Sequence, residues 1–220
     1  MISFRCSALL FDMDGVLVDS HAVYTRTWLR WAKRHGLDPE PLLAAGLGRR
    51  TREALLSVVP HLATDQEVDW LDTTELQDLE GIVEVRGAAD LVRSLPPERW
   101  AVVTSAGRDL ALSRLQAARV PAPSLLVTAE DIARGKPAPD GFLLAAHRLG
   151  WAAETCLVFE DAPAGIAAAR AAGMRPVALT TMYGVDRLPP ADASIADFKG
   201  VQVRLDGTAI VVQLPSQPAP

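Results

Sequence analysis

The chain has 220 residues, 49% hydrophobic and 22% charged, with a formal net charge of -5 at pH 7. This length allows one large core, or one core with a small second domain, and the acidic balance without a basic run excludes nucleic acid and anionic membranes as expected partners. Because no secretory pattern or bilayer-spanning apolar stretch is found, we expect a cytoplasmic protein with Cys6 and Cys156 reduced in its core. We also expect it to be a monomer.

The first predicted element is a buried strand over residues 8–11, followed at once by Asp12, Met13, Asp14 and Gly15. Two carboxylates one residue apart at the end of a buried strand repel each other and lose hydration, and a divalent cation is the usual compensation. The glycine lets the backbone turn sharply after the strand. Since ligands of open α/β sheets bind at the carboxyl ends of strands, this stretch predicts a metal site with a carboxylate free to act as a nucleophile.

Helical patterns follow, with no strand among them. Apolar spacing and helix-ending residues predict one helix between Ser20 and Gly36 and further helices over 39–45, 51–59 and 65–79. From residue 85 onward, predicted helices and strands alternate along the chain. Helices are predicted over 87–95, 108–118, 140–149 and 164–172, and strands over 100–104, 125–127, 156–159, 176–179 and 194–196. Such alternation implies a parallel sheet with right-handed crossovers.

The long gap between the first strand and the next one, near Trp100, exceeds what a single crossover helix needs. The pattern therefore predicts an α/β fold: a Rossmann-like parallel-sheet core with an inserted α-helical cap. We place the core at residues 1–19 and 84–213 and the cap at 20–83. Two apolar runs that flank Asp206 and Gly207 predict a β-hairpin. The proline-rich end, 214–220, is expected to be a disordered tail.

Polar side chains follow four of the predicted strands, and a parallel sheet brings them to one edge. They are Asp12 and Asp14, Ser105 with Thr104 before it, Lys136, and Glu160 with Asp161. Such a set suits phosphoryl transfer, in which a protein mainly positions groups and neutralises charge. Asp12 can attack phosphorus, and Asp14 can protonate the leaving oxygen and then activate water.

The remaining groups suit the phosphate and a cation. Ser105 and the N–H groups after it, beginning with Ala106, can bind phosphate oxygens, and Lys136 can neutralise the nucleophile and the phosphate. Asp12, Asp161 and Glu160 suit Mg²⁺. Three alternatives stay open from the residues alone: Glu160 can act behind the metal ligands, Glu160 and Asp161 can cap the next helix, and Thr104 replaces Ser105 if the register shifts by one.

In order and spacing these residues resemble the four motifs of the haloacid dehalogenase (HAD) superfamily: Asp12-Met13-Asp14-Gly15-Val16, Ser105, Lys136-Pro137 and Glu160-Asp161. The strings 159–166, 48–51 and 101–105 are similar to those of glycerol-phosphate and 2-deoxyglucose-6-phosphate phosphatases, and the resemblance covers nearly all of residues 5–185. It implies a Mg²⁺-dependent phosphatase of sugar or polyol phosphates that acts through an aspartyl-phosphate. It further implies that Asp12 and Asp161 bind the metal by side chain and Asp14 by its backbone carbonyl.

One departure from the related β-phosphoglucomutases separates hydrolysis from the alternatives. The histidine that those mutases carry on the first cap helix corresponds here to Tyr24, and His21 lies three residues too early. A phosphosugar mutase and a catalytically silent module that binds a phosphorylated ligand are therefore the alternatives to a phosphatase. In the cap, arginines at 49, 50 and 52 lie where they can clamp a substrate, and Arg50 is the candidate ligand.

Overall fold

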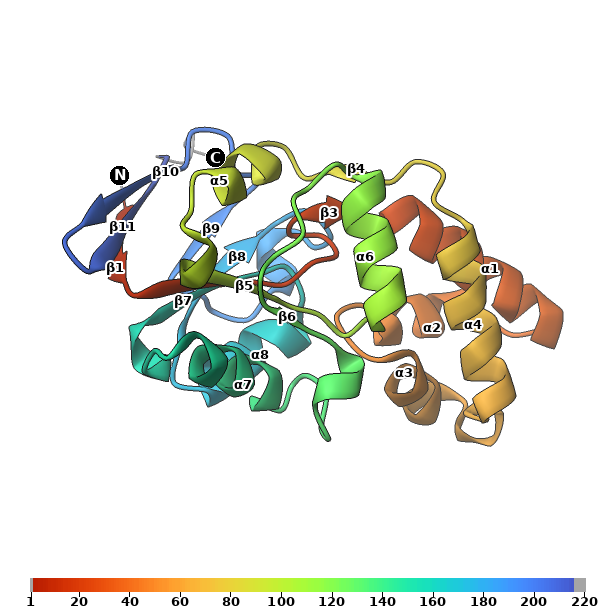
Figure 1. Ribbon diagram of the computed structural model, residues 1–220. Helices are drawn as coiled ribbons and strands as arrows, with labels where there is room; N and C mark the ends of the chain where they lie inside the picture. Colours follow the sequence, from red (N-terminus) through yellow and green to blue (C-terminus); the bar gives the residue numbers. More distant parts are fainter. Residues whose placement is uncertain (1, 216–220) are drawn as a thin grey trace.

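The computed structural model of the protein describes residues 2–215. A parallel sheet of six strands lies at its centre, in the spatial order β6-β5-β2-β7-β8-β9 (Figure 1). The strands are β2 (Ala8–Phe11), β5 (Trp100–Val103), β6 (Leu126–Val127), β7 (Cys156–Glu160), β8 (Arg175–Leu179) and β9 (Ala193–Ile195). β2 is in the middle, where Leu10 is in register with Ala101 on one side and Val158 on the other. The predicted parallel sheet is confirmed.

Two layers of helices cover the sheet. Because side chains alternate along a strand, β2 presents Leu9 and Phe11 to one face and Ala8 and Leu10 to the other. The first face packs against α5 (Ala88–Arg93) and α6 (Arg108–Ala117), and the second against α7 (Asp140–Leu149) and α8 (Pro163–Ala171). Short 3₁₀ helices lie in the connections, at Pro60–Leu62, Pro97–Arg99, Ala129–Asp131, Ala153–Thr155 and Val185–Arg187.

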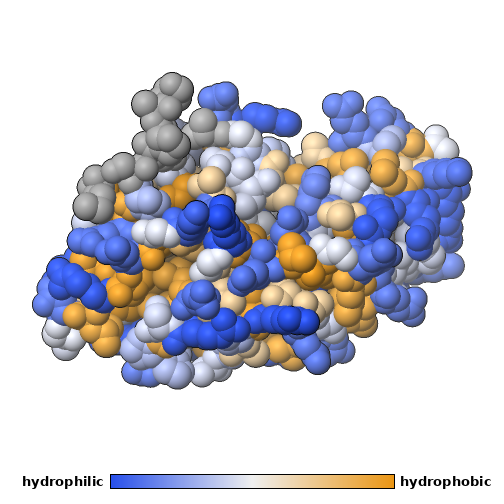
Figure 2. All heavy atoms as spheres, turned by 90° about the horizontal axis from the view of Figure 1, so that it is seen from above, coloured by the Kyte–Doolittle hydropathy of each residue, from blue (hydrophilic) through white to orange (hydrophobic). Residues whose placement is uncertain are grey.

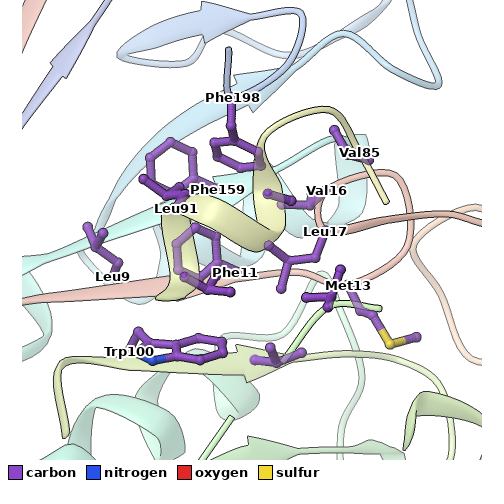
Figure 3. Close-up of a cluster of buried hydrophobic side chains, with 14 of the residues drawn as sticks. Leu9, Phe11, Met13, Val16, Leu17, Val85, Leu91, Trp100, Phe159 and Phe198 are labelled. Carbon is purple, nitrogen blue, oxygen red and sulfur yellow. The ribbon is translucent and has the colours of Figure 1, made fainter. Parts of the chain in front are cut away.

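Aromatic side chains fill the first face beneath the end of β2 (Figure 3). The rings of Phe11 and Phe159 stack with their centroids 5.1 Å apart, and Phe198 meets both edge-on. Met13, Val16 and Leu17, in the loop after β2, are fully buried in the same cluster. Packing of apolar side chains on both sides of Asp12 therefore fixes the loop that carries the two aspartates.

Four helices, here called the helical cap, lie at one end of the molecule beside α6 (Figure 1). They are α1 (His21–His35), α2 (Pro39–Gly46), α3 (Thr51–Val58) and α4 (Asp65–Gln77). They bury a hydrophobic cluster of their own, built on Trp28, Trp31, Leu42, Leu55 and Leu71. Gly36 ends α1 in the left-handed conformation, φ 65°, and Asp38 caps α2 by accepting from the Glu40 amide at 3.0 Å.

The chain enters and leaves the helical cap through two short strands, β3 (Val18–Asp19) and β4 (Val83–Glu84). These strands pair antiparallel, with Asp19 opposite Val83. The sequence predicted the inserted helical cap, and the fold class is confirmed. The boundary residues, 20 and 83, remain a prediction.

A second, three-stranded antiparallel sheet lies at the end of the molecule remote from the helical cap (Figure 1). It consists of β1 (Ile2–Cys6), β10 (Gln202–Asp206) and β11 (Ala209–Leu214), in the order β1-β11-β10. The hairpin around Asp206 and Gly207 forms as predicted. Strand β1 was not among the elements predicted from the sequence. Leu214, assigned to the tail, is a buried strand residue opposite Ile2, and the tail from 216 onward lies outside the described residues.

The surface carries a mixture of polar and apolar side chains (Figure 2). Hydrophilic residues predominate on the visible face of the end that holds the helical cap. Among residues 2–215, no helix is both long enough and apolar enough to cross a membrane. Isolated exposed apolar side chains, such as Leu56 and Leu205, are ordinary for a protein surface.

Candidate active site

The two aspartates after β2 lie at the carboxyl end of the sheet, next to the end of β7. The Asp12 amide donates to the carbonyl of Phe159 at 3.0 Å, which ties the start of the loop to β7. Gly15 has φ +76°, and its amide closes the turn on Val18 at 2.7 Å. A Cβ on Gly15 would lie 2.0 Å from Oδ2 of Asp161. Glycine at this position therefore lets the Asp161 carboxylate approach the loop that holds both aspartates.

Lys136 is buried at the centre of the site and bridges two carboxylates. Its Nζ donates to Asp12 Oδ1 at 2.5 Å, to Glu160 Oε1 at 2.6 Å and to the carbonyl of Val103 at 3.1 Å. Burial alone would lower the pKa of Lys136, but the two carboxylates outweigh it and raise the pKa. Lys136 is therefore a permanent cation, and it occupies one of the two oxygens of Asp12.

Glu160 connects Lys136 to the turn that carries Asp161. Its Oε1 accepts from Lys136, and its Oε2 accepts from the amides of Asp161 and Ala162 at 2.9 and 3.0 Å. A Cβ at Gly165, on the first turn of α8, would lie 1.6 Å from Glu160 Oε1. Glycine at 165 is thus required for the buried glutamate to reach both the lysine and the turn that presents Asp161.

Negative charge exceeds positive charge in this cluster. One oxygen from each of Asp12, Glu160 and Asp161 lies within 4.8 Å of the others, and all three residues are buried. Burial raises the pKa of Asp12 to about 7, and burial with the nearby Glu160 and Asp12 raises the pKa of Asp161 well above its ordinary value. Three carboxylates face one ammonium group, and their oxygens are the ligands that Mg²⁺ prefers, so the donor set fits this ion.

Asp14 points from the same loop toward the helical cap and is held by two donors. Its Oδ1 accepts from the Ser20 hydroxyl at 2.5 Å and from Nη1 of Arg114, on α6, at 2.9 Å. The other branch of this guanidinium, Nη2, donates to Glu75 Oε2, on α4, at 2.7 Å. Burial raises the pKa of Glu75, although Arg114 opposes the shift. Neither Arg114 nor Glu75 was among the site residues predicted from the sequence.

The strand end after β5 places Ser105 at the junction with the helical cap. The Ser105 hydroxyl donates to the carbonyl of Gly48, in the loop between α2 and α3, at 3.0 Å. Thr104 is buried, and its Oγ1 accepts from the Ala106 amide at 3.1 Å, which shapes the turn into α6. Ser105 therefore faces the domain junction, whereas Thr104 stabilises the backbone behind it.

A cavity of about 330 Å³ lies between the end of the sheet and the helical cap. Asp12, Asp14, Ser105 and Asp161 line it from the sheet side, and Arg49, Asp72 and Glu75 line it from the cap side. Several charged groups of both signs thus surround a space large enough for a small polar molecule.

Comparison with known proteins identifies the family. A family model described as haloacid dehalogenase-like hydrolase matches residues 6–173 of the chain. The chain belongs to this hydrolase family. It is 39% identical over 207 residues to hexitol phosphatase A of Escherichia coli K12, covering 90% of this chain and 94% of that protein. It is 31% identical over 218 residues to glycerol-1-phosphate phosphohydrolase 2 of Saccharomyces cerevisiae, covering 94% and 87%.

A solved structure supports the same conclusion. A hydrolase from Pseudomonas syringae superposes with a TM-score of 0.77 at 27% identity, covering 87% of this chain and 94% of that chain. The HAD-like resemblance inferred from the motifs is therefore confirmed, together with the fold class. In this HAD-like hydrolase, the residues predicted from strand ends, Asp12, Asp14, Lys136 and Asp161, do converge on one edge of the sheet.

Three of the predicted ligands have other partners in this HAD-like hydrolase. The Arg50 guanidinium donates to the carbonyls of Ile132 and Ala133 at 3.0 and 3.3 Å, in the segment that leads to Lys136. Glu160 uses both oxygens in protein hydrogen bonds, and the Ala106 amide donates to Thr104. Substrate binding by Arg50 and Ala106, and metal binding by Glu160, remain predictions.

Two arginines that line the cavity, Arg49 and Arg114, were not chosen as ligands from the sequence. Nε of Arg49 is buried without a hydrogen-bond partner among the described residues, and its side chain lines the cavity. Arg114 lies on the buried face of α6 at helical spacing with Leu110, Ala111 and Leu115. An arginine at a core position of an amphipathic helix is a signal that could have identified it, because such a charge needs buried partners.

Proposed function

We propose that this HAD-like hydrolase is a Mg²⁺-dependent phosphatase that cleaves a small phosphomonoester, a sugar or polyol phosphate, through an aspartyl-phosphate on Asp12. The observation that carries the proposal is the buried contact of Lys136 with Asp12 Oδ1, which leaves Oδ2 of the same carboxylate for attack. Relatives named hexitol phosphatase and glycerol-1-phosphate phosphohydrolase, matched over most of their length, support the substrate class.

In the first step, Asp12 attacks the phosphorus and the bond between phosphorus and the ester oxygen breaks. Asp14 gives its proton to the departing alkoxide, so the products of this step are a neutral alcohol and the acyl phosphate. The Lys136 ammonium offsets the charge that collects on Asp12 and the phosphoryl oxygens. The Ser105 hydroxyl, at the domain junction, would turn from the Gly48 carbonyl to a phosphoryl oxygen.

In the second step, water hydrolyses the aspartyl-phosphate. Asp14, now ionised, takes a proton from the water as its oxygen attacks phosphorus, and the Asp12 carboxylate leaves. Asp12 and Asp161 would hold Mg²⁺ by their side chains, with the Asp14 backbone carbonyl as a further ligand. When bound, this ion would neutralise phosphoryl charge and help align the phosphate.

Two carboxylates on the cap side of the cavity favour a polyhydroxylated leaving group. Asp72 accepts from the Thr51 hydroxyl at 2.6 Å and Glu75 accepts from Arg114, and both carboxylates line the cavity. Carboxylate oxygens accept hydrogen bonds from hydroxyl groups and repel a second anionic group. A neutral polyol or sugar therefore fits the part of the wall formed by Asp72 and Glu75 better than a second phosphate does, whereas Arg49 lines another part of the same wall.

Two observations weigh against the mutase alternative. The Tyr24 hydroxyl donates to the carbonyl of Leu43 at 2.8 Å, and burial raises the Tyr24 pKa, so this group is not available to move protons. His21 is exposed at the start of α1. The silent binding module is disfavoured because the nucleophile, the acid–base carboxylate and the buried lysine are all present.

We also propose that the protein is a cytoplasmic monomer. Cys6 and Cys156 are free and buried, and burial raises the pKa of both thiols, which keeps them unreactive. Size-exclusion chromatography with light scattering tests the monomer, and fractionation of cells tests the location.

Release of inorganic phosphate from a panel of sugar and polyol phosphates tests the proposed function. The panel is run with Mg²⁺, with EDTA, and with the Asp12→Asn variant. We expect metal-dependent release that the variant loses, together with a phosphorylated wild-type protein trapped by acid quench. Binding of sugar phosphates without any release would contradict the proposal, and conversion of a sugar 1-phosphate to its 6-phosphate would replace it with the mutase.

A further inference from the structure

Arg114 connects the acid–base carboxylate of the sheet region to a carboxylate of the helical cap. Its side chain is 5% exposed, and its two terminal nitrogens bind different elements: Nη1 donates to Asp14 and Nη2 to Glu75. Nε is buried without a hydrogen-bond partner among the described residues. Both branches of this guanidinium therefore have a partner only when one carboxylate from each side of the domain junction is in place.

The contact with Arg114 also decides which oxygen of Asp14 is free. Ser20 and Arg114 both donate to Oδ1, so a proton on the carboxyl group has to reside on Oδ2. No hydrogen bond among the described residues uses Oδ2, and Asp14 lines the cavity. A general acid must present its proton to the leaving oxygen within hydrogen-bond reach, so the two donors on Oδ1 orient the group for this task.

We propose that Arg114 is a positioning residue: through Glu75 it makes the orientation of Asp14 depend on the seating of the helical cap. This inference rests on the proposed function. If the cap moves away, Glu75 leaves with α4, and Arg114 loses the partner that holds its second branch. The guanidinium no longer fixes the orientation of the Asp14 carboxyl group. Asp14 therefore donates its proton efficiently only when the helical cap lies over the bound substrate.

The test compares two esters that differ in their need for a proton. The leaving group of a polyol phosphate is an alkoxide, which must be protonated, whereas that of p-nitrophenyl phosphate, or of acetyl phosphate if the aryl group does not fit, departs as a stable anion. The kcat/KM value reports the steps up to departure of the leaving group. We expect Arg114→Gln to lower kcat/KM about 100-fold for the polyol phosphate, the lower range for loss of general acid catalysis, and to leave the activated ester nearly unchanged.

Further variants separate positioning from folding. Arg114→Lys keeps the charge but lacks the forked guanidinium that reaches two carboxylates. It should lower kcat/KM selectively for the polyol phosphate, by a smaller factor than Arg114→Gln, and its melting temperature should stay close to that of the wild type. Glu75→Gln removes the charged cap-side partner of Arg114 and leaves the Asp14 contact in place, so it should show the same selective loss for the polyol phosphate, smaller than in Arg114→Gln. Arg170→Gln is the matched control, because it removes an arginine from α8 that pairs with Asp192 at 3.2 Å away from the cavity.

The outcomes distinguish the two proposals. A selective loss for the polyol phosphate in both Arg114 variants supports the positioning role. An equal loss for both esters, or no loss in either variant, overturns it while leaving the phosphatase intact. If the wild-type protein hydrolyses neither ester, the proposed function fails and the positioning role fails with it.

Discussion

Two buried cations of this protein each lie between two carboxylates, but they differ in what they join. Lys136 binds Asp12 and Glu160, and all three belong to the sheet region. Arg114 binds Asp14 on the sheet side and Glu75 on the helical cap. The first arrangement is complete within one rigid layer of the fold. The second is complete only when the helical cap contacts the sheet region. The nucleophile Asp12 is therefore held at all times, whereas the acid–base group Asp14 is held fully only when the cap is in contact.

Removing the cation of the fixed arrangement should have the largest effect. Lys136→Met leaves Asp12 and Glu160 buried without their partner, which should lower the free energy of unfolding by about 3–5 kcal/mol. Phosphatase activity should fall at least about 100-fold, because charge on the phosphoryl group is no longer offset. Denaturant unfolding and phosphate release measure the two effects. The double variant Lys136→Met with Glu160→Gln should recover stability but not activity; recovery of both would contradict the role given to Lys136.

The excess negative charge of the same arrangement predicts a response to metal. Burial and neighbouring carboxylates raise the pKa of Asp161, so the metal-free protein loses stability as pH rises from the ordinary range of a carboxyl group toward that raised pKa. Mg²⁺ at 100 times its dissociation constant should raise the free energy of unfolding by about 2.7 kcal/mol. Asp161→Asn should stabilise the metal-free protein and abolish the shift with Mg²⁺. A Mg²⁺ shift that persists in this variant would place the ion elsewhere.

The conditional arrangement predicts a coupling that spans the domain junction. Arg114→Gln and Glu75→Gln should each destabilise the protein, and their double variant should depart from additivity by about 0.5–3 kcal/mol, because the residues form one ion pair at 2.7 Å. Thermal unfolding of the four proteins measures this coupling. Additive effects would mean that the two charges do not depend on each other in solution.

An exposed ion pair should change the free energy of unfolding least, and it serves as the reference for the buried pairs. Arg5 and Asp206 join β1 to β10 at 2.5 Å, but their side chains are 61% and 46% exposed. Water and salt screen such a pair, so Arg5→Gln should change the free energy of unfolding by less than about 1 kcal/mol. Thermal unfolding at two salt concentrations measures it. A loss as large as that of Lys136→Met would show that burial does not explain the difference between the pairs.

Residues whose placement depends on one strand end could be predicted from the sequence. Asp12 and Asp161 directly follow strands β2 and β7, and a parallel sheet brings such positions to one edge whatever its loops do. Lys136 lies in the connection after β6, and its place in the loop between a strand and a helix was the signal. The inserted cap followed from the length of chain between two strands. These inferences needed only the order and direction of the elements.

Residues whose role depends on a long-range contact could not be predicted in this way. Strand β1 is defined by pairing with β11, at the other end of the chain. The choice between Arg49 and Arg50 depends on the orientation of the cap loop, which places Arg50 on the Ile132 carbonyl. Arg114 was missed because its partners lie 100 and 39 residues away in the sequence. No local pattern specifies which charged groups will face each other across two domains.

The pairing of β3 with β4 has a consequence for how such a protein can diverge. The chain departs toward the helical cap after Asp19 and returns at Val83, its neighbour across the ladder. An inserted segment whose two ends are adjacent can be lengthened, exchanged for another segment, or replaced by a tight turn, while β3 and β4 keep their register. On the proposed function, an exchanged cap would meet a different leaving group while the sheet region keeps its nucleophile, but the new cap would also have to supply a partner for Arg114.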